Sequence, residues 1–380
     1  MKFNTKTIHA GQKPEETSGA VMPPIFQTST YVQDAPNVNK GYDYARVGNP
    51  TRTALEKLIA GLEGADGCAC FASGCAAMDA VLKMFRPGDQ IIASNDLYGG
   101  TYRLFTEVFE PYGIDFTFVD MTDIDNVRDA ATNKAKLLWI ETPTNPLLRV
   151  VDIEALTAFA RQHNILTLVD NTFASPYLQQ PLALGAHLVL HSTTKYLGGH
   201  SDVIGGAVAT SENDVMEKLR FQVKTTGAVP GPMDCYLTLR GIKTLSVRVK
   251  QAVENAKEVA SFLDHHPAVE QVIYPGLKTH KQHEIAKKQM KDFGAMVSFS
   301  LKDDSQEKAQ AFMSRTNIFA LAESLGGVES LISHPASMTH GSIPKEIREK
   351  AGLKDSLIRL SVGIEDAEDL IDDLDQAFEK

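Results

Sequence analysis

Val189-Leu190-His191-Ser192-Thr193-Thr194-Lys195-Tyr196-Leu197-Gly198-Gly199 is the stretch that decides the fold and the chemistry expected of this 380-residue chain. Apolar residues 188–190 are typical of a strand, and a polar turn with one lysine follows them. A lysine beside buried apolar residues loses hydration, which lowers its pKa and leaves part of its amine neutral. A neutral amine can bond covalently to an aldehyde. The alternative is an exposed turn residue, because most lysines lie on the surface.

A second apolar run, residues 165–169, ends in Asp170. The run is typical of a strand that is buried on both faces of a parallel sheet. Open α/β sheets bind ligands at the carboxyl ends of their strands, so the Asp170 carboxylate and the Lys195 amine are expected at one crevice. The alternative role for Asp170 is to cap the next element.

A third segment predicts a phosphate site. Residues 68–72 are typical of a strand, and Ser73 is the expected N-cap of the helix that follows. Gly74 lets the backbone approach a ligand closely, and the first-turn amides of a helix bind anions. The hydroxyls of Ser192 and Thr194 are placed to bind the same phosphate. Serine and glycine before a helix are a weak signal unless the other two segments accompany them.

The three segments together predict pyridoxal 5'-phosphate as the cofactor. A helix N-terminus and two hydroxyls hold the phosphate, a lysine bonds to the aldehyde, and a carboxylate keeps the pyridine nitrogen protonated, so that the ring accepts electrons. The chain is therefore expected to be an enzyme. A carrier or regulatory protein that binds the cofactor without catalysis is the remote alternative, and it would need neither Lys195 as a base nor Arg359.

Motifs along the whole chain resemble one family. They are YARVGNPTR at 44–52, SGCAA at 73–77, DLYGGT at 96–101, ETPTNP at 141–146, VDNTF at 169–173, STTKY at 192–196 and LIRLSVG at 357–363. Their order is similar to that of the cystathionine γ-lyase and γ-synthase branch of the Cys/Met-metabolism pyridoxal-phosphate enzymes. The resemblance implies the aspartate-aminotransferase-like fold (fold type I), with a large α/β domain and a smaller α+β domain.

Length and element pattern also predict two domains, which follow an N-terminal arm. Residues 1–48 have scattered prolines and glycines and no long period, so an extended arm that lies on a neighbouring subunit is expected. Strands and helices alternate over residues 49–241, which predicts a cofactor-binding α/β domain with a mostly parallel sheet. Residues 242–380 are expected to form an α+β domain with two strands and covering helices. The predicted helices are 53–62, 74–82, 101–109, 245–265, 306–315 and 367–378, and the further predicted strands are 89–94, 137–140, 296–301 and 357–362.

Composition narrows the partners and the location. The net charge of -10 argues against a nucleic acid or an anionic membrane as partner. No apolar run is long enough to span a membrane, and residues 1–6 lack the apolar core of a signal peptide. The cysteines Cys68, Cys70, Cys75 and Cys235 fit neither a disulfide framework nor a zinc site, so no metal is expected. A cytoplasmic protein with reduced thiols is therefore expected.

The resemblance assigns further cofactor contacts. Tyr44 and Arg46 would cross to a partner subunit and bind the phosphate of its cofactor, in a homotetramer built from dimers with shared sites. A surface ion pair is the alternative for Arg46. Tyr98 would stack on the pyridine ring and assist proton transfer, although a core aromatic residue is also consistent with its position. Asn145, held between Pro143 and Pro146, would bond the phenolic oxygen of the cofactor and the substrate carboxylate.

Two further cofactor contacts were expected near the ring. Thr172, two residues after Asp170, is assigned to the cofactor site by the resemblance. Cys75 lies in the phosphate turn, where a small residue packed under the cofactor is expected rather than a catalytic thiol.

Substrate contacts are expected in both predicted domains. Arg359 sits in the middle of an apolar strand, where its charge needs a partner, and a substrate α-carboxylate would suit its fork. An internal ion pair is the alternative. By resemblance, Glu323 and Arg103 would hold the distal amino-acid end of a long substrate, and Ser324 would steady the α-carboxylate. A solvated helix face is the alternative for Arg103.

The predicted reaction is the γ-elimination of L-cystathionine to L-cysteine, 2-oxobutyrate and ammonia, with Lys195 and Tyr98 as the catalytic residues. The alternative is cystathionine γ-synthase, which makes cystathionine from O-succinyl- or O-acetylhomoserine and cysteine. Glu323 and Ser324 occur in both branches and do not separate them. The resemblance of residues 322–340 and 357–370 favours the lyase. Methionine γ-lyases carry a cysteine where this chain has Gly100, which disfavours that branch.

Overall fold

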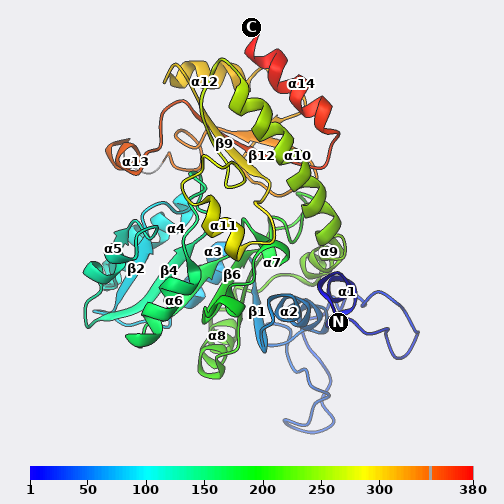
Figure 1. The fold of residues 1–380 in the computed structure, drawn as a ribbon. Helices are drawn as coiled ribbons and strands as arrows, with labels where there is room; N and C mark the ends of the chain where they lie inside the picture. The colour runs from blue at the N-terminus through cyan, green and yellow to red at the C-terminus, as the bar shows by residue number, and fades with distance from the viewer. Residues whose placement is uncertain (342–344, 380) are drawn as a thin grey trace.

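A computed structural model describes residues 1–341 and 345–379 of the chain. Two sheets form its framework, one of seven strands and one of five (Figure 1). The seven-stranded sheet has the order β1-β7-β6-β5-β4-β2-β3. Its strands are β1 Gly67–Phe71, β2 Gln90–Ser94, β3 Asp115–Val119, β4 Ala135–Glu141, β5 Leu166–Asp170, β6 Leu188–Ser192 and β7 Gly206–Thr210.

This sheet is mostly parallel, as predicted. Only β7 runs against its neighbours β1 and β6 among the strands described. Strands β3 and β7 were not predicted, because β7 is built from small residues and β3 is only partly buried. Residues 101–109 are also not one α-helix. α4 spans Gly99–Arg103, and a π-helical segment, Leu104–Phe109, continues from it.

Helices cover both faces of the sheet. On one face, α3 (Gly74–Leu82), α8 (Asn213–Thr226) and the π-helical segment pack in one apolar cluster with Leu168, Leu188 and Leu190. On the other face, α2 (Pro50–Glu63), α5 (Ile124–Ala130) and α6 (Ile153–Gln162) contribute to the packing. Burial on both faces explains why the central strands are continuous apolar runs. Two short helical segments, α7 (Ser175–Leu178) and Pro181–Leu184, connect β5 to β6.

The smaller sheet has five strands in the order β10-β11-β12-β9-β8. They are β8 Val269–Ile273, β9 Met296–Leu301, β10 Ala320–Leu321, β11 Leu331–Ser333 and β12 Leu357–Ser361. The prediction of two strands is therefore wrong in number, although the two predicted ones, β9 and β12, are present. β10 and β11 have two and three residues, too few to show an alternating pattern.

Long helices accompany this second sheet. α10 (Leu245–His265) and α14 (Ala367–Phe378) have the predicted bounds, and they pack with β9 in one apolar cluster (Figure 1). The remaining helices are α9 Pro232–Ile242, α11 His283–Gln289, α12 Gln306–Met313 and α13 Lys345–Ala351. We propose that the two domains divide between residues 241 and 242, at the end of α9. Among the residues described, no helix combines the length and apolar character needed to cross a membrane.

The N-terminal segment differs from the extended arm that was predicted. Residues Phe3–His9 form α1, which packs against α2 and α10. The ring of Phe3 lies 5.5 Å from that of Tyr177. A helix this short has too few residues for a visible period, which explains why the sequence did not show it. Residues 10–49 have almost no regular structure, and several of their apolar side chains are exposed, among them Val21, Val32 and Val38.

A buried arginine of α10 ties the two parts together at the lysine turn. The guanidinium of Arg248 donates hydrogen bonds to the carbonyl oxygens of Tyr196 (3.0 Å) and Gly241 (2.9 Å), and to the Thr244 hydroxyl (3.1 Å). Gly199 has φ +74°, and a Cβ there would lie 2.0 Å from Arg248 Nη1. The turn that carries Lys195 is thus held by α10, which also packs against the second sheet.

Candidate active site

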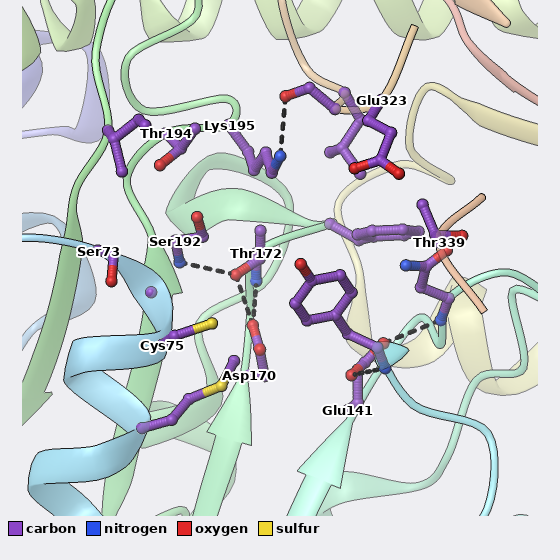
Figure 2. A pocket seen from close by; sticks show the side chains of 18 of the residues that line it. Ser73, Cys75, Glu141, Asp170, Thr172, Ser192, Thr194, Lys195, Glu323 and Thr339 are labelled. Atoms are coloured by element: carbon purple, nitrogen blue, oxygen red, sulfur yellow. Dashed lines mark hydrogen bonds between the residues drawn. The ribbon is translucent and has the colours of Figure 1, made fainter. Parts of the chain in front are cut away.

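A cavity of about 350 Å³ opens at the carboxyl ends of β4, β5 and β6, where the second sheet faces the first (Figure 2). It brings together most of the residues predicted from the sequence. From the first sheet and its loops come Ser73, Gly74, Cys75, Tyr98, Asn145, Asp170, Thr172, Ser192, Thr194 and Lys195. From the second part come Glu323, Ser324 and Arg359.

The start of α3 forms a cradle for an anion. Ser73 caps the helix as predicted, because its hydroxyl accepts a hydrogen bond from the Ala76 N–H (3.0 Å). The N–H groups of Gly74 and Cys75 have no partner within the helix and are free to meet a ligand. A Cβ at Gly74 would lie 3.0 Å from Ser192 Cβ. Glycine therefore keeps this corner of the cavity open, beside the hydroxyls that the phosphate needs.

Asp170 occupies the last position of the buried strand β5 and both caps a turn and lines the cavity. Its Oδ1 accepts hydrogen bonds from the Thr172 N–H (3.0 Å) and the Thr172 hydroxyl (2.5 Å). The Thr172 oxygen in turn accepts from the Ser192 N–H (2.9 Å), which links β5 to β6. Burial raises the pKa of Asp170, while the bonds from Thr172 oppose the rise. A cationic group in the cavity would favour the ionised carboxylate further.

Lys195 presents its amine to the cavity from the turn after β6. Its Nζ donates a hydrogen bond to the Ser324 hydroxyl (2.8 Å). Burial, together with the charge of Arg359, lowers the pKa of Lys195 to about 8. The predicted fall in pKa is thus confirmed, and a share of this amine is neutral and nucleophilic near neutral pH.

Arg359 is buried in the middle of β12. Its Nη1 donates to the Asn145 side-chain oxygen (2.7 Å), and its Nη2 donates to the Ser324 carbonyl oxygen (3.0 Å). Its Nε has no hydrogen-bond partner, and the two acceptors that its other nitrogens meet among the described residues are an amide and a carbonyl oxygen rather than a carboxylate. Burial lowers the pKa of Arg359 to about 10. The group therefore remains cationic and can pair with an incoming anion.

Tyr98 and Cys75 also face the cavity. The Tyr98 side chain is partly exposed there, and burial raises the pKa of its hydroxyl, which stays protonated as a proton donor. Cys75 is accessible from the cavity, but the surrounding protein atoms displace part of the water around its thiol, and this partial burial raises the pKa of the thiol. A raised pKa disfavours the reactive thiolate, which agrees with the expectation that Cys75 is not a nucleophile.

Three predicted residues lie outside the cavity of this single chain. Tyr44 and Arg46 lie together at a separate groove, with the Arg46 Cζ 5.4 Å from the Tyr44 ring centroid. The Arg46 guanidinium donates to the Lys224 carbonyl oxygen rather than to a carboxylate. Arg103 is exposed at the end of α4, although its charge opposes the rise that burial causes in the pKa of both Cys75 and Tyr98.

Two buried residues near the cavity were missed by the sequence reasoning. Glu141 ends β4 and lines the cavity. His340 follows β11 in the sequence, and its ring contacts the backbone of Asn145, which also lines the cavity. An acid directly after a buried strand is the signal that identified Asp170, and Glu141 carries the same signal. His340 has no comparable signal, because its partners are backbone carbonyls far away in the sequence.

The arrangement fits pyridoxal 5'-phosphate closely. The cradle at α3, the amine of Lys195 and the carboxylate of Asp170 match the phosphate, the aldehyde and the ring nitrogen of the cofactor. The fold and the site define a pyridoxal-phosphate-dependent enzyme. Residues 4–379 match the family described as Cys/Met metabolism PLP-dependent enzyme, and the chain belongs to this family.

Relatives and solved structures narrow the chemistry to cystathionine metabolism. The cystathionine beta-lyase of Lactococcus lactis subsp. cremoris (strain MG1363) is 53% identical over 378 residues, covering 100% of this chain and 99% of that protein. The cystathionine gamma-lyase of Bacillus subtilis (strain 168) is 50% identical and covers 100% of both chains. The crystal structure of cystathionine gamma synthase from Xanthomonas oryzae pv. oryzae in complex with cystathionine has a TM-score of 0.97 at 45% identity, covering 100% of this chain and 98% of that one.

Proposed function

We propose that the enzyme cleaves L-cystathionine by γ-elimination, giving L-cysteine, 2-oxobutyrate and ammonia. The observation that carries the proposal is the placing of two opposite charges in one cavity, the buried cation of Arg359 and the carboxylate of Glu323. Burial lowers the pKa of both Lys195 and Arg359, and the negative charge of Glu323 opposes that fall in both, so it acts on both across the cavity. A substrate with two amino-acid ends satisfies both charges.

The α-carboxylate of the substrate pairs with Arg359. Asn145 holds one Nη of the guanidinium and the Ser324 carbonyl holds the other, so the fork has a fixed plane. The distal ammonium group meets Glu323, and Arg103 outside the cavity faces the distal carboxylate. Together these contacts orient the Cα–H bond toward the amine of Lys195.

When bound, pyridoxal phosphate supplies an electron sink for the negative charge that develops at the substrate Cα. Asp170 keeps the ring nitrogen protonated. Lys195 would accept the Cα proton, because its amine is the basic group at the centre of the cavity, and would have to give that proton up before the neutral amine could take a second one from Cβ. The Tyr98 hydroxyl protonates the sulfur that leaves from Cγ.

Two other reactions use the same groups and are outcomes of the same test. A γ-synthase removes the acyl group of an activated homoserine and adds cysteine. A β-lyase, the activity named for the Lactococcus relative, cleaves the bond at Cβ and releases homocysteine and pyruvate. The β-reaction removes no proton from Cβ, whereas γ-elimination does. Deuterium placed at Cβ of the substrate is therefore lost to solvent in γ-elimination and retained in the β-reaction.

A product assay of the holoenzyme decides among them. L-cystathionine is supplied alone in one reaction, and O-succinyl- or O-acetylhomoserine is supplied with cysteine in the others. Cysteine and 2-oxobutyrate from the first support γ-elimination, whereas homocysteine and pyruvate establish β-elimination. Cystathionine formed faster in the others identifies a synthase. If the protein binds the cofactor but forms no product in any of the three reactions, the enzymatic roles proposed for this site are contradicted.

We also propose that the enzyme is a homotetramer in which Tyr44 and Arg46 complete the phosphate site of a partner. Mixing a Lys195→Ala chain with an Arg46→Ala chain tests this directly. If Arg46 acts across the interface, each mixed dimer has one intact site, and activity returns to about a quarter of wild type. No recovery after demonstrated subunit exchange places Arg46 in its own subunit's site. The cytoplasmic location remains a prediction from composition.

A further inference from the structure

Tyr98 and Asn145 lie on two loops, the first after β2 and the second after β4. Neither residue is inside a strand or a long helix, so the regular structure does not fix its position. Both face the cavity, and the Asn145 side chain also binds Arg359. Whatever holds these two backbones therefore determines where the ring of Tyr98 and the fork of Arg359 lie.

Glu141 holds both loops from the side of the first sheet. Its side chain is 4% exposed, and it is the last residue of β4. One carboxylate oxygen accepts a hydrogen bond from the Tyr98 N–H, and the other accepts from the Asn145 N–H, each at 2.9 Å (Figure 2). Burial and the neighbouring Asp170 carboxylate raise the pKa of Glu141. A carboxyl group retains acceptor capacity in either protonation state, so the two bonds persist.

His340 holds the same loops from the side of the second sheet. Its ring is 3% exposed, and its Nε2 lies 3.2 Å from the Leu97 carbonyl oxygen and 3.0 Å from the Asn145 carbonyl oxygen. Carbonyl oxygens only accept, so Nε2 carries the proton and donates to both. Nδ1 then accepts from the Thr339 hydroxyl (2.8 Å). Burial, with the charge of Arg359, lowers the pKa of His340 to about 4, so the ring is neutral at neutral pH.

The two side chains grip the same backbone from opposite directions. In the peptide group between Leu97 and Tyr98, the N–H donates to Glu141 and the carbonyl oxygen accepts from the ring Nε2–H of His340. The N–H of Asn145 likewise donates to Glu141, and its carbonyl oxygen accepts from the same ring Nε2–H. The chain around His340 also packs closely on this loop, because a Cβ at Gly99 would lie 2.3 Å from the Thr339 carbonyl oxygen.

We propose that Glu141 and His340 form a clamp of positioning residues that fixes Tyr98 over the cofactor ring and Asn145 against Arg359. The inference rests on the proposed roles of Tyr98, Asn145 and Arg359 and extends them to two residues that touch none of the reacting atoms. Glu141 ends a strand of the first sheet and His340 lies in the turn that follows β11 of the second, so the clamp also fixes how the two walls of the cavity meet.

The test uses holoenzyme with substitutions that remove one half of the clamp. Glu141→Gln replaces one acceptor by an NH2 group, and His340→Leu removes the donor, whereas His340→Gln restores an N–H donor. Each disruptive variant is expected to lower kcat/KM for the proposed substrate by about 100-fold, the size of effect that a displacement of about 1 Å produces. His340→Gln is expected to recover a large part of that loss.

Matched controls separate positioning from stability. Asp373 is a buried carboxylate that accepts hydrogen bonds from the N–H groups of Asn317, Ile318 and Phe319. His334 is a buried histidine near His340 whose Nε2 lies 2.7 Å from the Asp355 carbonyl oxygen. Asp373→Asn and His334→Leu are expected to lower Tm as the clamp variants do, with kcat/KM of the folded holoenzyme within about threefold of wild type.

A readout that needs no turnover is the visible circular dichroism of the bound cofactor, normalised to its absorbance. This signal reports the tilt of the cofactor ring. The Glu141 and His340 variants are therefore expected to change the signal, and the Asp373 and His334 controls are expected to leave it unchanged. The double variant Glu141→Gln with His340→Leu is expected to lose less than the product of the two single losses, because both act on the same loops.

Three results overturn the clamp: unchanged dichroism and kcat/KM in both Glu141→Gln and His340→Leu, equal losses in the controls, or losses that multiply in the double variant. If one variant does not fold, the other decides. Wild-type protein that does not cleave cystathionine contradicts the proposed function instead, and the dichroism of the variants still decides the clamp.

Discussion

The amine of Lys195 lies 2.8 Å from the hydroxyl oxygen of Ser324, and this bond joins the turn after β6 to the loop between β10 and β11. Ser324 has φ 108°, a conformation that residues other than glycine rarely adopt. Its carbonyl oxygen accepts a hydrogen bond from Arg359, so one strained residue contacts both cations of the cavity. Strain of this kind persists where the surrounding structure holds it, as it does at functional sites.

Replacement of Lys195 by alanine is expected to lower turnover by more than about 1,000-fold, because the variant lacks both the covalent attachment and the base. Lys195→Ala should retain the fold, since the side chain's hydrogen bond within the described ranges is a single one, to the Ser324 hydroxyl. The measurement is turnover together with far-ultraviolet circular dichroism. Borohydride reduction of the wild-type holoenzyme, followed by peptide mapping, should place the cofactor on Lys195, and an adduct at another lysine would contradict the assignment.

The rate at which the apoprotein captures pyridoxal phosphate should rise with pH with a midpoint near the Lys195 pKa of about 8 and level off at higher pH. Only the neutral amine attacks an aldehyde, and the pKa of Lys195 is lowered to about 8. At pH 7 about one amine in ten is then neutral, far more than for an ordinary lysine. Stopped-flow absorbance across pH 6 to about 10.5 measures the midpoint, and a midpoint near that of an exposed lysine contradicts the burial argument.

The charges around Lys195 should shift that midpoint in opposite directions. Arg359 lowers the pKa of Lys195, so Arg359→Gln is expected to raise the midpoint. Glu323 raises the same pKa, so Glu323→Gln is expected to lower it. Shifts of one sign in both variants would show that a general disturbance of the cavity, and not charge, controls the amine.

Arg359→Lys should raise KM by about tenfold to a hundredfold with a smaller change in kcat, because lysine keeps the charge but loses the fork that pairs with a carboxylate. Arg248→Lys is the matched control. Arg248 is also a buried arginine, but its three hydrogen bonds go to protein oxygens outside the cavity. Because Arg248 holds the turn of Lys195, its substitution is expected to lower stability by about 2 kcal/mol and to reduce kcat, while KM stays near the wild-type value. Steady-state kinetics and thermal unfolding measure the two effects, and an unchanged KM in Arg359→Lys removes the carboxylate role.

Asp170→Asn is expected to reduce kcat by about 100-fold while the cofactor stays bound. Asparagine can still accept from Thr172, so the local turn survives, but it lacks the negative charge that favours a protonated ring nitrogen. Asp170→Glu, which keeps the charge, should retain more activity. Equal activity in Asp170→Asn and wild type would assign the carboxylate to capping alone.

The sequence predicted elements best where one pattern dominated. The apolar stripe of residues 245–265 and that of 367–378 gave helix bounds that the structure confirms. Strand β7, with small residues, and β10, with two, carry no such pattern. Tertiary pairing, rather than local propensity, makes them strands.

The site divides in a similar way. Asp170, Lys195 and Arg359 could be found because a charged residue beside a buried strand is unusual in itself. Glu141 carries the same signal and could have been singled out, but its role, like that of His340, depends on backbone atoms of distant loops. Backbone groups are the same in every residue, so no sequence pattern marks them.

The cavity belongs to neither sheet alone. The first sheet contributes the groups proposed to hold the cofactor, and the second contributes Glu323, Ser324 and Arg359, proposed to meet the substrate. Substitutions on the wall from the second sheet can therefore change the substrate, while the wall from the first sheet keeps the same cofactor. Two relatives that each share about half of their residues with this chain carry the different names cystathionine beta-lyase and cystathionine gamma-lyase.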